Sequence, residues 1–91
     1  MKYYEIIFSG RVQGVGFRYY TYRLAQQYNI KGYVKNLSNG NVKVVAGSDD
    51  KQKMDIFLQQ VTSGPSFANI TNSTVEKLEN SKEYNTFDIK Y

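Results

Sequence analysis

The spacing of apolar residues changes from segment to segment along this chain, and the order of the changes limits the fold more than any other feature. Residues 3–9 alternate between the two faces of an extended chain, which predicts a strand. Residues 17–28 show helical spacing instead, which predicts a helix. The inward face of this helix comprises Phe17, Tyr20, Thr21, Leu24, Ala25 and Tyr28. The chain therefore passes from a strand into a helix across a short segment that contains Gly10, Gly14 and Gly16.

A hairpin is predicted after this helix. Residues 32–38 and 41–47 are typical of two strands, and Asn39-Gly40 lies between them. This pair favours a two-residue turn because both turn positions need positive φ, which asparagine and glycine tolerate best. We therefore expect two antiparallel strands joined by a tight turn.

A second helix and two further strands complete the chain. Ser48 or Asp49 is placed to cap this helix, and Gly64-Pro65 ends it. Residues 67–78 contain a fourth predicted strand, and residues 86–91 form a fifth. The last strand places its apolar residues on one face, as expected for a strand that covers a core.

The order of these elements predicts a single domain that spans residues 1–91. A chain of 91 residues suffices for one core, built from one sheet and a pair of helices. Because strand–helix–strand crossovers are right-handed, the βαββαβ order gives an antiparallel sheet with both helices on one face. We therefore predict an α+β fold, the ferredoxin-like sandwich. This fold supports many functions, so the function has to be argued from particular residues.

The composition excludes several kinds of chemistry. The chain contains neither histidine nor cysteine, which rules out a thiolate nucleophile, a phosphohistidine intermediate and a cysteine-ligated metal. We therefore expect no metal ion and no cofactor. Twelve basic residues against eight acidic ones give a net charge of +4, which favours anionic partners or simply keeps the surface soluble. No membrane span or signal peptide is evident, so we expect a cytoplasmic protein that does not bind membranes.

The segment that carries the chemistry links the first strand to the first helix, and reads Gly10-Arg11-Val12-Gln13-Gly14-Val15-Gly16-Phe17-Arg18. Backbone N–H groups at a helix start lack internal partners, and the helix dipole adds partial positive charge there. A glycine-rich turn lets several of these groups point at one anion. Arg18 adds a guanidinium that can grip phosphate oxygens with two hydrogen bonds. The segment is typical of a phosphate site, although alone it also fits a tight connection with an exposed arginine.

A second informative residue is Asn36, which ends the second predicted strand after Lys31-Gly32-Tyr33-Val34-Lys35. Strands prefer β-branched and aromatic residues, so an asparagine here needs a reason. It either leads the chain into the hairpin or presents an amide that orients a ligand or a water molecule. Residue type alone leaves both readings open.

Segments 10–18 and 32–36 together closely resemble the two signature stretches of the acylphosphatase family. The resemblance covers the whole chain, including the element order, the Asn-Gly pair and the closing residues 87–91. It implies that Arg18 and Asn36 are the catalytic residues, with Arg18 binding phosphate and Asn36 positioning the attacking water. It also implies a phosphate-binding loop of backbone N–H groups, formed by Gln13, Gly14, Val15, Gly16, Phe17 and Arg18. Tyr33 is often tryptophan in relatives, a difference that touches neither role.

The reaction that the resemblance implies is metal-independent hydrolysis of the carboxyl–phosphate bond of an acyl phosphate. The partners would be a small-molecule acyl phosphate and inorganic phosphate, the latter as product or inhibitor. A carboxylate leaves without being protonated first, so this reaction suits a chain that has no histidine. The acyl group stays unspecified because the loop recognises only the phosphate.

Two other functions share some of these features. The RNA recognition motif has the same strand order, and residues 31–34 faintly resemble its aromatic-bearing strand. That resemblance lies on the second strand, and the third carries no aromatic residue, so we expect no nucleic-acid binding. The other alternative is a non-catalytic phosphate-binding module, since related domains occur inside larger carbamoyl-transfer maturation proteins. This chain stands alone, so we expect a free enzyme that is a monomer.

Overall fold

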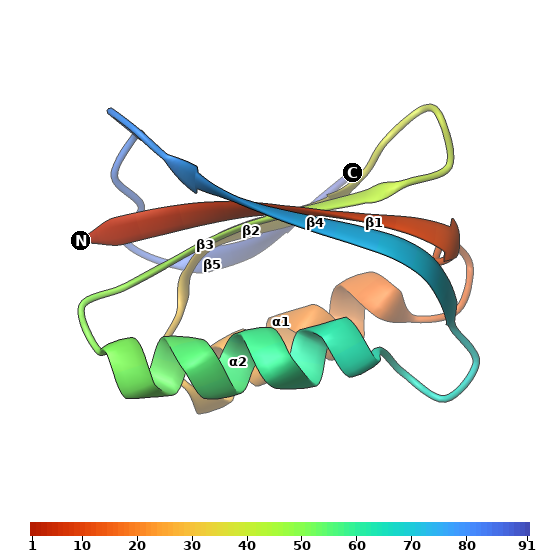
Figure 1. Ribbon diagram of the computed structural model, residues 1–91, viewed down its shortest axis with the longest axis horizontal. Helices are drawn as coiled ribbons and strands as arrows, with labels where there is room; N and C mark the ends of the chain where they lie inside the picture. The colour runs from red at the N-terminus through yellow and green to blue at the C-terminus, as the bar shows by residue number, and fades with distance from the viewer.

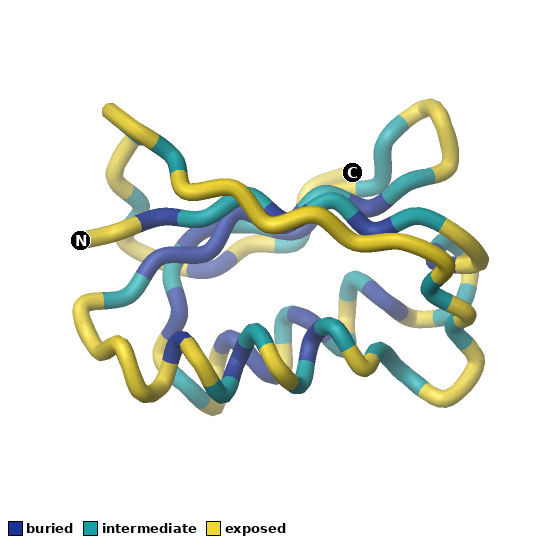
Figure 2. The backbone as a smooth tube through the Cα atoms, in the orientation of Figure 1, coloured by how far each residue is buried: buried dark blue, intermediate teal, exposed yellow.

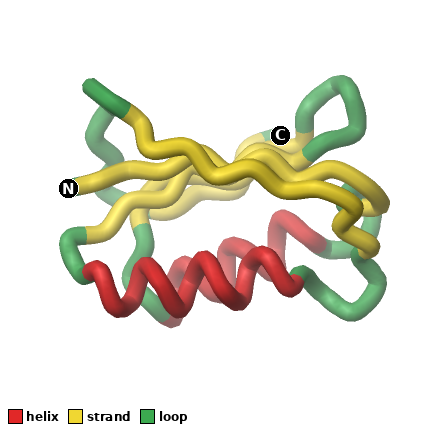
Figure 3. Tube along the Cα trace, in the orientation of Figure 1, coloured by secondary structure: helices red, strands yellow, loops and turns green.

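The computed structural model describes residues 1–91 and consists of a twisted sheet lying on two helices (Figure 1). Its elements in chain order are β1 (Lys2–Arg11), α1 (Phe17–Gln27), β2 (Lys31–Asn36), β3 (Val42–Ser48), α2 (Lys51–Ser63), β4 (Asn69–Leu78) and β5 (Phe87–Lys90). Both helices cover the same face of the sheet, as predicted (Figure 3). Neither helix has the length and apolar character that a membrane crossing requires.

The strand order is β4-β1-β3-β2-β5, and the sheet is mixed. The first four strands pair antiparallel, as the sequence predicts, whereas β5 runs parallel to β2. The direction of β4 explains this difference. Leu78 of β4 pairs with Tyr3, and Lys31 of β2 lies at the same end of the sheet. The chain therefore leaves β4 at the end where β2 begins, and β5 continues from there in the direction of β2.

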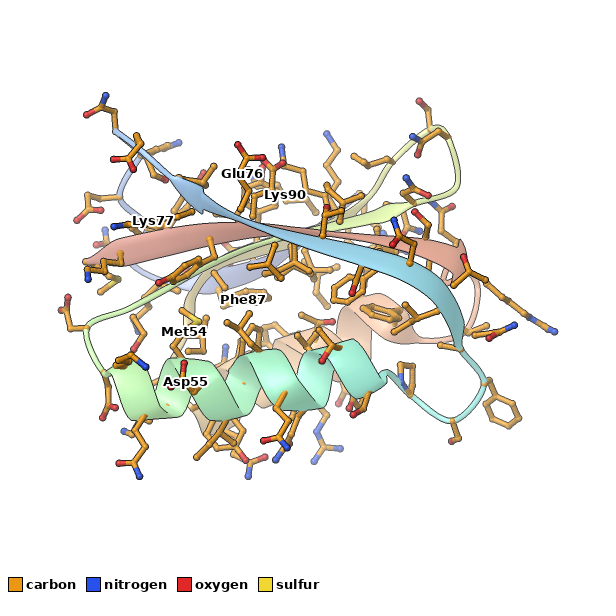
Figure 4. The ribbon with its side chains drawn as sticks, viewed as in Figure 1. Met54, Asp55, Glu76, Lys77, Phe87 and Lys90 are labelled. Atoms are coloured by element: carbon orange, nitrogen blue, oxygen red, sulfur yellow. The ribbon has the colours of Figure 1, made fainter.

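The core fills the space between the sheet and the helices (Figure 2). Met54 and Phe87 point into this layer, while Glu76 and Lys90 project from the opposite face of the sheet (Figure 4). The largest fully buried side chains are those of Phe8, Phe17 and Phe57. Tyr20 packs against the core, as expected, whereas Tyr19 is exposed. Tyr22 is half-buried because it also packs against the core.

The β2–β3 hairpin differs from the predicted two-residue turn. Leu37 N donates to Asn41 O at 2.8 Å, so three residues, 38–40, form the loop. Gly40 N donates to Leu37 O, and Gly40 alone has positive φ, at 93°. These contacts describe a turn of four residues that ends in a left-handed glycine, the common three-residue hairpin. The prediction of positive φ at Asn39 was therefore wrong, and one left-handed residue is enough.

The predicted cap of α2 was also misplaced. Asp50 is the N-cap, and its Oδ1 accepts a hydrogen bond from Lys53 N at 3.1 Å. Ser48 still ends β3, and its Oγ accepts from Asp50 N at 3.0 Å. Because β3 extends to Ser48, the helix begins one or two residues later than the sequence signals suggested.

Buried aromatic residues anchor both ends of the connection between β1 and α1. Phe8 precedes the connection and Phe17 follows it, and their ring centroids lie 5.0 Å apart. Phe8 pairs with Val42, which also pairs with Asn36 on its other side. The core therefore fixes the glycine-rich segment and Asn36 at the same end of the sheet, which is the right-hand end in Figure 1.

Candidate functional site

A small cavity of about 220 Å³ opens at this end of the sheet, between the start of α1 and the ends of β2 and β5. Its lining comprises Val12, Gly14, Gly16, Phe17, Arg18, Tyr19, Asn36, Ile89 and Tyr91. Arg18 and Asn36, which are far apart in the sequence, thus line one cavity together with two loop glycines. Larger cavities are also present and none of them contains Arg18, although one of about 620 Å³ also has Asn36 in its lining.

The loop before α1 leaves its backbone N–H groups without partners in the chain. None of residues 13–18 donates a backbone hydrogen bond, and the first such donor in α1 is Tyr20, which donates to Gly16 O at 3.0 Å. Gly16 is the N-cap and supplies no side chain that could cap the helix. The first turn also lacks an acidic residue. The positive end of the helix dipole and its N–H groups are therefore available to an anion.

Two glycines give this loop its shape. Gly14 has φ 74° and Gly16 has φ 78°, a left-handed conformation that is unfavourable for residues with a side chain. A Cβ atom placed at either glycine would meet no atom within 4 Å. The glycines are thus explained by backbone conformation rather than by lack of space, and the region in front of the loop is open.

Arg18 is held at the cavity by the last residues of the sequence. Its Nη1 donates to Lys90 O at 3.2 Å, and its guanidinium carbon lies 4.6 Å from the centroid of the Tyr91 ring. No carboxylate forms a salt bridge with Arg18. The carbonyl and the ring restrict the guanidinium without neutralising it, so its full positive charge stays available to an anion.

Asn36 ends β2 and contributes the one buried side-chain polar atom that lacks a partner. Its Oδ1 is buried and accepts no hydrogen bond. A buried acceptor of this kind costs about 1–3 kcal/mol when it stays unpaired, so such atoms usually meet a water molecule or a ligand. Asn36 lines the cavity, so this unpaired acceptor belongs to a residue of the cavity wall.

Some residues of this cavity are those predicted from the sequence, and others are not. Of the predicted loop residues, Gln13 and Val15 do not line it. Val15 packs against the core, and the side chain of Gln13 turns towards the β2–β3 hairpin. Tyr19, Ile89 and Tyr91 line the cavity without having been predicted there. The alternation in residues 86–91 indicated that Ile89 and Tyr91 share a face, but it gave no sign that this face meets Arg18.

Comparison with known proteins identifies the family and the fold of this chain. A model of the acylphosphatase family matches residues 4–89. An acylphosphatase of Archaeoglobus fulgidus is 46% identical over 87 residues, which cover 96% of each chain. The crystal structure of acylphosphatase from Bacillus subtilis superposes with a TM-score of 0.92 at 34% identity, covering both chains fully. A crystal structure of full-length HypF is similar at a TM-score of 0.84 and 34% identity, over 99% of this chain but only 12% of HypF.

The fold defines a small ferredoxin-like α+β protein, and the turn between its first strand and first helix lines a cavity together with Arg18 and Asn36. Relatives at 36–46% identity over most of the chain carry the same name and nearly the same length. The chain belongs to the acylphosphatase family and is an enzyme of that class.

Proposed function

We propose that this chain hydrolyses the carboxyl–phosphate bond of acyl phosphates, with Arg18 and the loop holding the phosphoryl group and Asn36 orienting water. One observation carries the proposal. Two residues line the same 220 Å³ cavity: Arg18, whose guanidinium has no carboxylate partner, and Asn36, whose buried amide oxygen has no donor. The first suits the anion, and the second suits a water molecule.

Phosphate binding rests on the unpaired N–H groups of residues 13–18 and on Arg18. The loop groups carry the partial positive charge of the helix start, and Arg18 adds a full charge. In the transition state, negative charge spreads over the three equatorial oxygens of the phosphoryl group. Donors that are already in place stabilise this charge without having to reorganise.

Asn36 supplies the acceptor that the attacking water needs. A water molecule that donates one hydrogen to Asn36 Oδ1 is fixed in orientation, with a lone pair free to face the phosphorus atom. As the water oxygen bonds to phosphorus, the bond between phosphorus and the carboxyl oxygen breaks, and the electron pair leaves with the carboxylate. The proton of the water passes to a phosphate oxygen or to solvent. The products are a carboxylate and inorganic phosphate.

This reaction needs neither a general acid nor a strong base. The carboxylate is a good leaving group, and the loose transition state demands little activation of the water. Positioning and charge stabilisation remain as the main contributions. A chain that lacks histidine and cysteine can supply both through Arg18, Asn36 and its backbone. We expect no metal ion and no cofactor to take part, and we expect inorganic phosphate to inhibit competitively.

The alternative is a module that binds phosphate or RNA without turnover. The observation that favours this alternative is the similarity to a short part of HypF, because in HypF a domain of this fold belongs to a longer protein. We propose that residues 1–91 act alone, as a cytoplasmic monomer that binds neither nucleic acid nor membranes. Turnover by the purified chain separates the two functions, because only an enzyme releases phosphate.

The test is phosphate release from benzoyl phosphate by the purified chain in the presence of EDTA. The wild type should turn over, and Arg18→Ala should be nearly inactive because the only positively charged side chain in the cavity lining is lost. Arg23→Ala is the matched control, since Arg23 is exposed on the same helix and does not line the cavity. A wild type without turnover, or an Arg18→Ala variant as active as Arg23→Ala, would overturn the proposal.

A further inference from the structure

The side chain of Gln13 joins the loop before α1 to the β2–β3 hairpin. Its Nε2 donates to the carbonyl oxygens of Leu37 and Asn41, each at 2.8 Å. A side-chain amide nitrogen has two hydrogens, so both are used. The side chain is half-buried, and no other side-chain hydrogen bond connects this loop with the hairpin.

Both acceptors lie at the base of the hairpin that carries Asn36. Leu37 follows Asn36 directly, and Leu37 N donates to the same Asn41 oxygen at 2.8 Å. Beyond this pair, residues 38–40 are exposed. Gln13 therefore grips the hairpin one residue from Asn36, at the last point where the two strands are still bonded to each other.

Within the sheet, the loop before α1 and Asn36 are connected only indirectly. The loop continues from β1, whereas Asn36 ends β2, and β3 lies between these strands. Backbone hydrogen bonds therefore link the loop to Asn36 only through β3. The side chain of Gln13 connects the loop to the hairpin directly, because its two acceptors lie 24 and 28 residues away in the sequence.

We propose that Gln13 is a positioning residue that holds Asn36 at a fixed distance from the phosphate-binding loop. The inference rests on the proposed function, because it assigns Gln13 an effect on the attack by water. The side chain of Gln13 is bonded to the hairpin and does not line the cavity, and only its backbone N–H belongs to the proposed phosphate-binding loop. It sets the distance between the group that orients the water and the groups that hold the phosphate.

This role predicts a specific kinetic signature. Removing the amide hydrogens lets the hairpin shift, and a misplacement of about 1 Å can reduce a rate by about 10²-fold. We expect Gln13→Met to lower kcat by roughly 10- to 100-fold, while the inhibition constant of inorganic phosphate changes by less than about threefold. Phosphate affinity should change little because the backbone N–H groups and Arg18 are unchanged.

A double-mutant cycle tests whether Gln13 acts through Asn36. Gln13→Met is measured in the wild type and in Asn36→Ala, and its effect should fall to less than about threefold once Asn36 is gone. Gln13→Glu is the second variant, because a carboxylate has no hydrogen to donate to the two carbonyls. Gln60→Met is the matched control, since Gln60 donates its side-chain amide to the Tyr28 hydroxyl on the helix side, away from the cavity. The inference is overturned if Gln13→Met lowers kcat by the same factor in the wild type and in Asn36→Ala, or if its kcat matches that of Gln60→Met.

A second readout does not depend on activity. The side-chain amide resonances of Asn36 should shift in Gln13→Met and Gln13→Glu and stay in place in Gln60→Met. If the wild type has no turnover, the proposed function fails, and shifted Asn36 resonances would still support the positioning contact. Unchanged Asn36 resonances in both Gln13 variants would overturn the inference, whatever the activity.

Discussion

The guanidinium of Arg18 lies 4.6 Å from the ring of Tyr91, although these residues come from opposite ends of the sequence. The parallel pairing of β5 with β2 creates this contact, because it carries the end of the chain to the side of α1 where Arg18 lies. The same strand places Lys90 O within 3.2 Å of Arg18 Nη1. The arginine is thus oriented by an aromatic ring and a carbonyl before any anion binds.

Removing Tyr91 should weaken this orientation without removing the charge. A cation–π contact at an exposed site contributes about 0.5–1 kcal/mol, which corresponds to a two- to fivefold effect. We expect Tyr91→Ala to have a KM for benzoyl phosphate raised by about two- to fivefold, with kcat changed less. Steady-state kinetics of Tyr91→Ala and of Tyr91→Phe provide the test, since phenylalanine keeps the ring. A loss as large as that of Arg18→Ala would show that Tyr91 does more than orient the arginine.

Replacing Asn36 should slow the chemical step more than it weakens phosphate binding. Asn36→Ala removes the unpartnered acceptor, and we expect kcat to fall by ~10²–10³, by analogy with the loss of one oriented polar group. Asn72→Ala serves as a control, because Asn72 is exposed on the edge strand β4. The measurement is kcat together with the inhibition constant for inorganic phosphate. Near-wild-type turnover of Asn36→Ala would contradict the role in orienting water.

Gly16 should matter for both stability and phosphate affinity. Alanine at φ 78° introduces strain of about 1–2 kcal/mol, although the added methyl group meets no neighbour. Gly40→Ala is a matched control, because Gly40 has φ 93°, has open space and lies outside the cavity lining. Urea unfolding should show both variants destabilised by a similar amount, and only Gly16→Ala should bind phosphate more weakly. Equal phosphate affinities in the two variants would argue against a role of the loop conformation in binding.

Stability should fall in alkaline solution, partly through Tyr20. Burial raises the pKa of Tyr20 above its ordinary value of 10.0, and its hydroxyl donates to Gln60 O at 2.7 Å. The folded state therefore favours the protonated form, so this contribution is complete below the unfolded pKa and is lost as the pH rises through the folded pKa. The urea midpoint of the wild type should decrease as the pH rises above about 10, and less steeply in Tyr20→Phe. Parallel pH profiles for the two proteins would refute this assignment.

Local patterns in the sequence were sufficient for most of the fold. Alternation and helical spacing located the strands and helices, and crossover handedness placed both helices on one face of the sheet. The direction of β5 was beyond these rules, because it depends on where the chain leaves β4 and which sheet edge remains open. The cap of α2 was misplaced because β3 extends to Ser48, and strand length is set by pairing with β1.

Some residues of the cavity could be predicted from local sequence patterns, whereas others depend on contacts between distant parts of the chain. Arg18 and Asn36 were singled out by residue type and motif, and the structure brings them to one cavity. Tyr19 and Tyr91 line it only because β5 and α1 pack together, which no local pattern encodes. The bonds from Gln13 to the hairpin likewise span more than 20 residues, so they became visible only with the fold.

The most direct test of the account is an NMR titration of the wild-type protein with inorganic phosphate. The backbone amides of residues 13–18 and the Arg18 side chain should show the largest shifts, with Asn36 responding as well, because all of them are assigned to one anion and its water. Arg18→Ala should abolish the response, and Arg23→Ala should keep it. Phosphate-induced shifts that map elsewhere, or that persist unchanged in Arg18→Ala, would contradict the account.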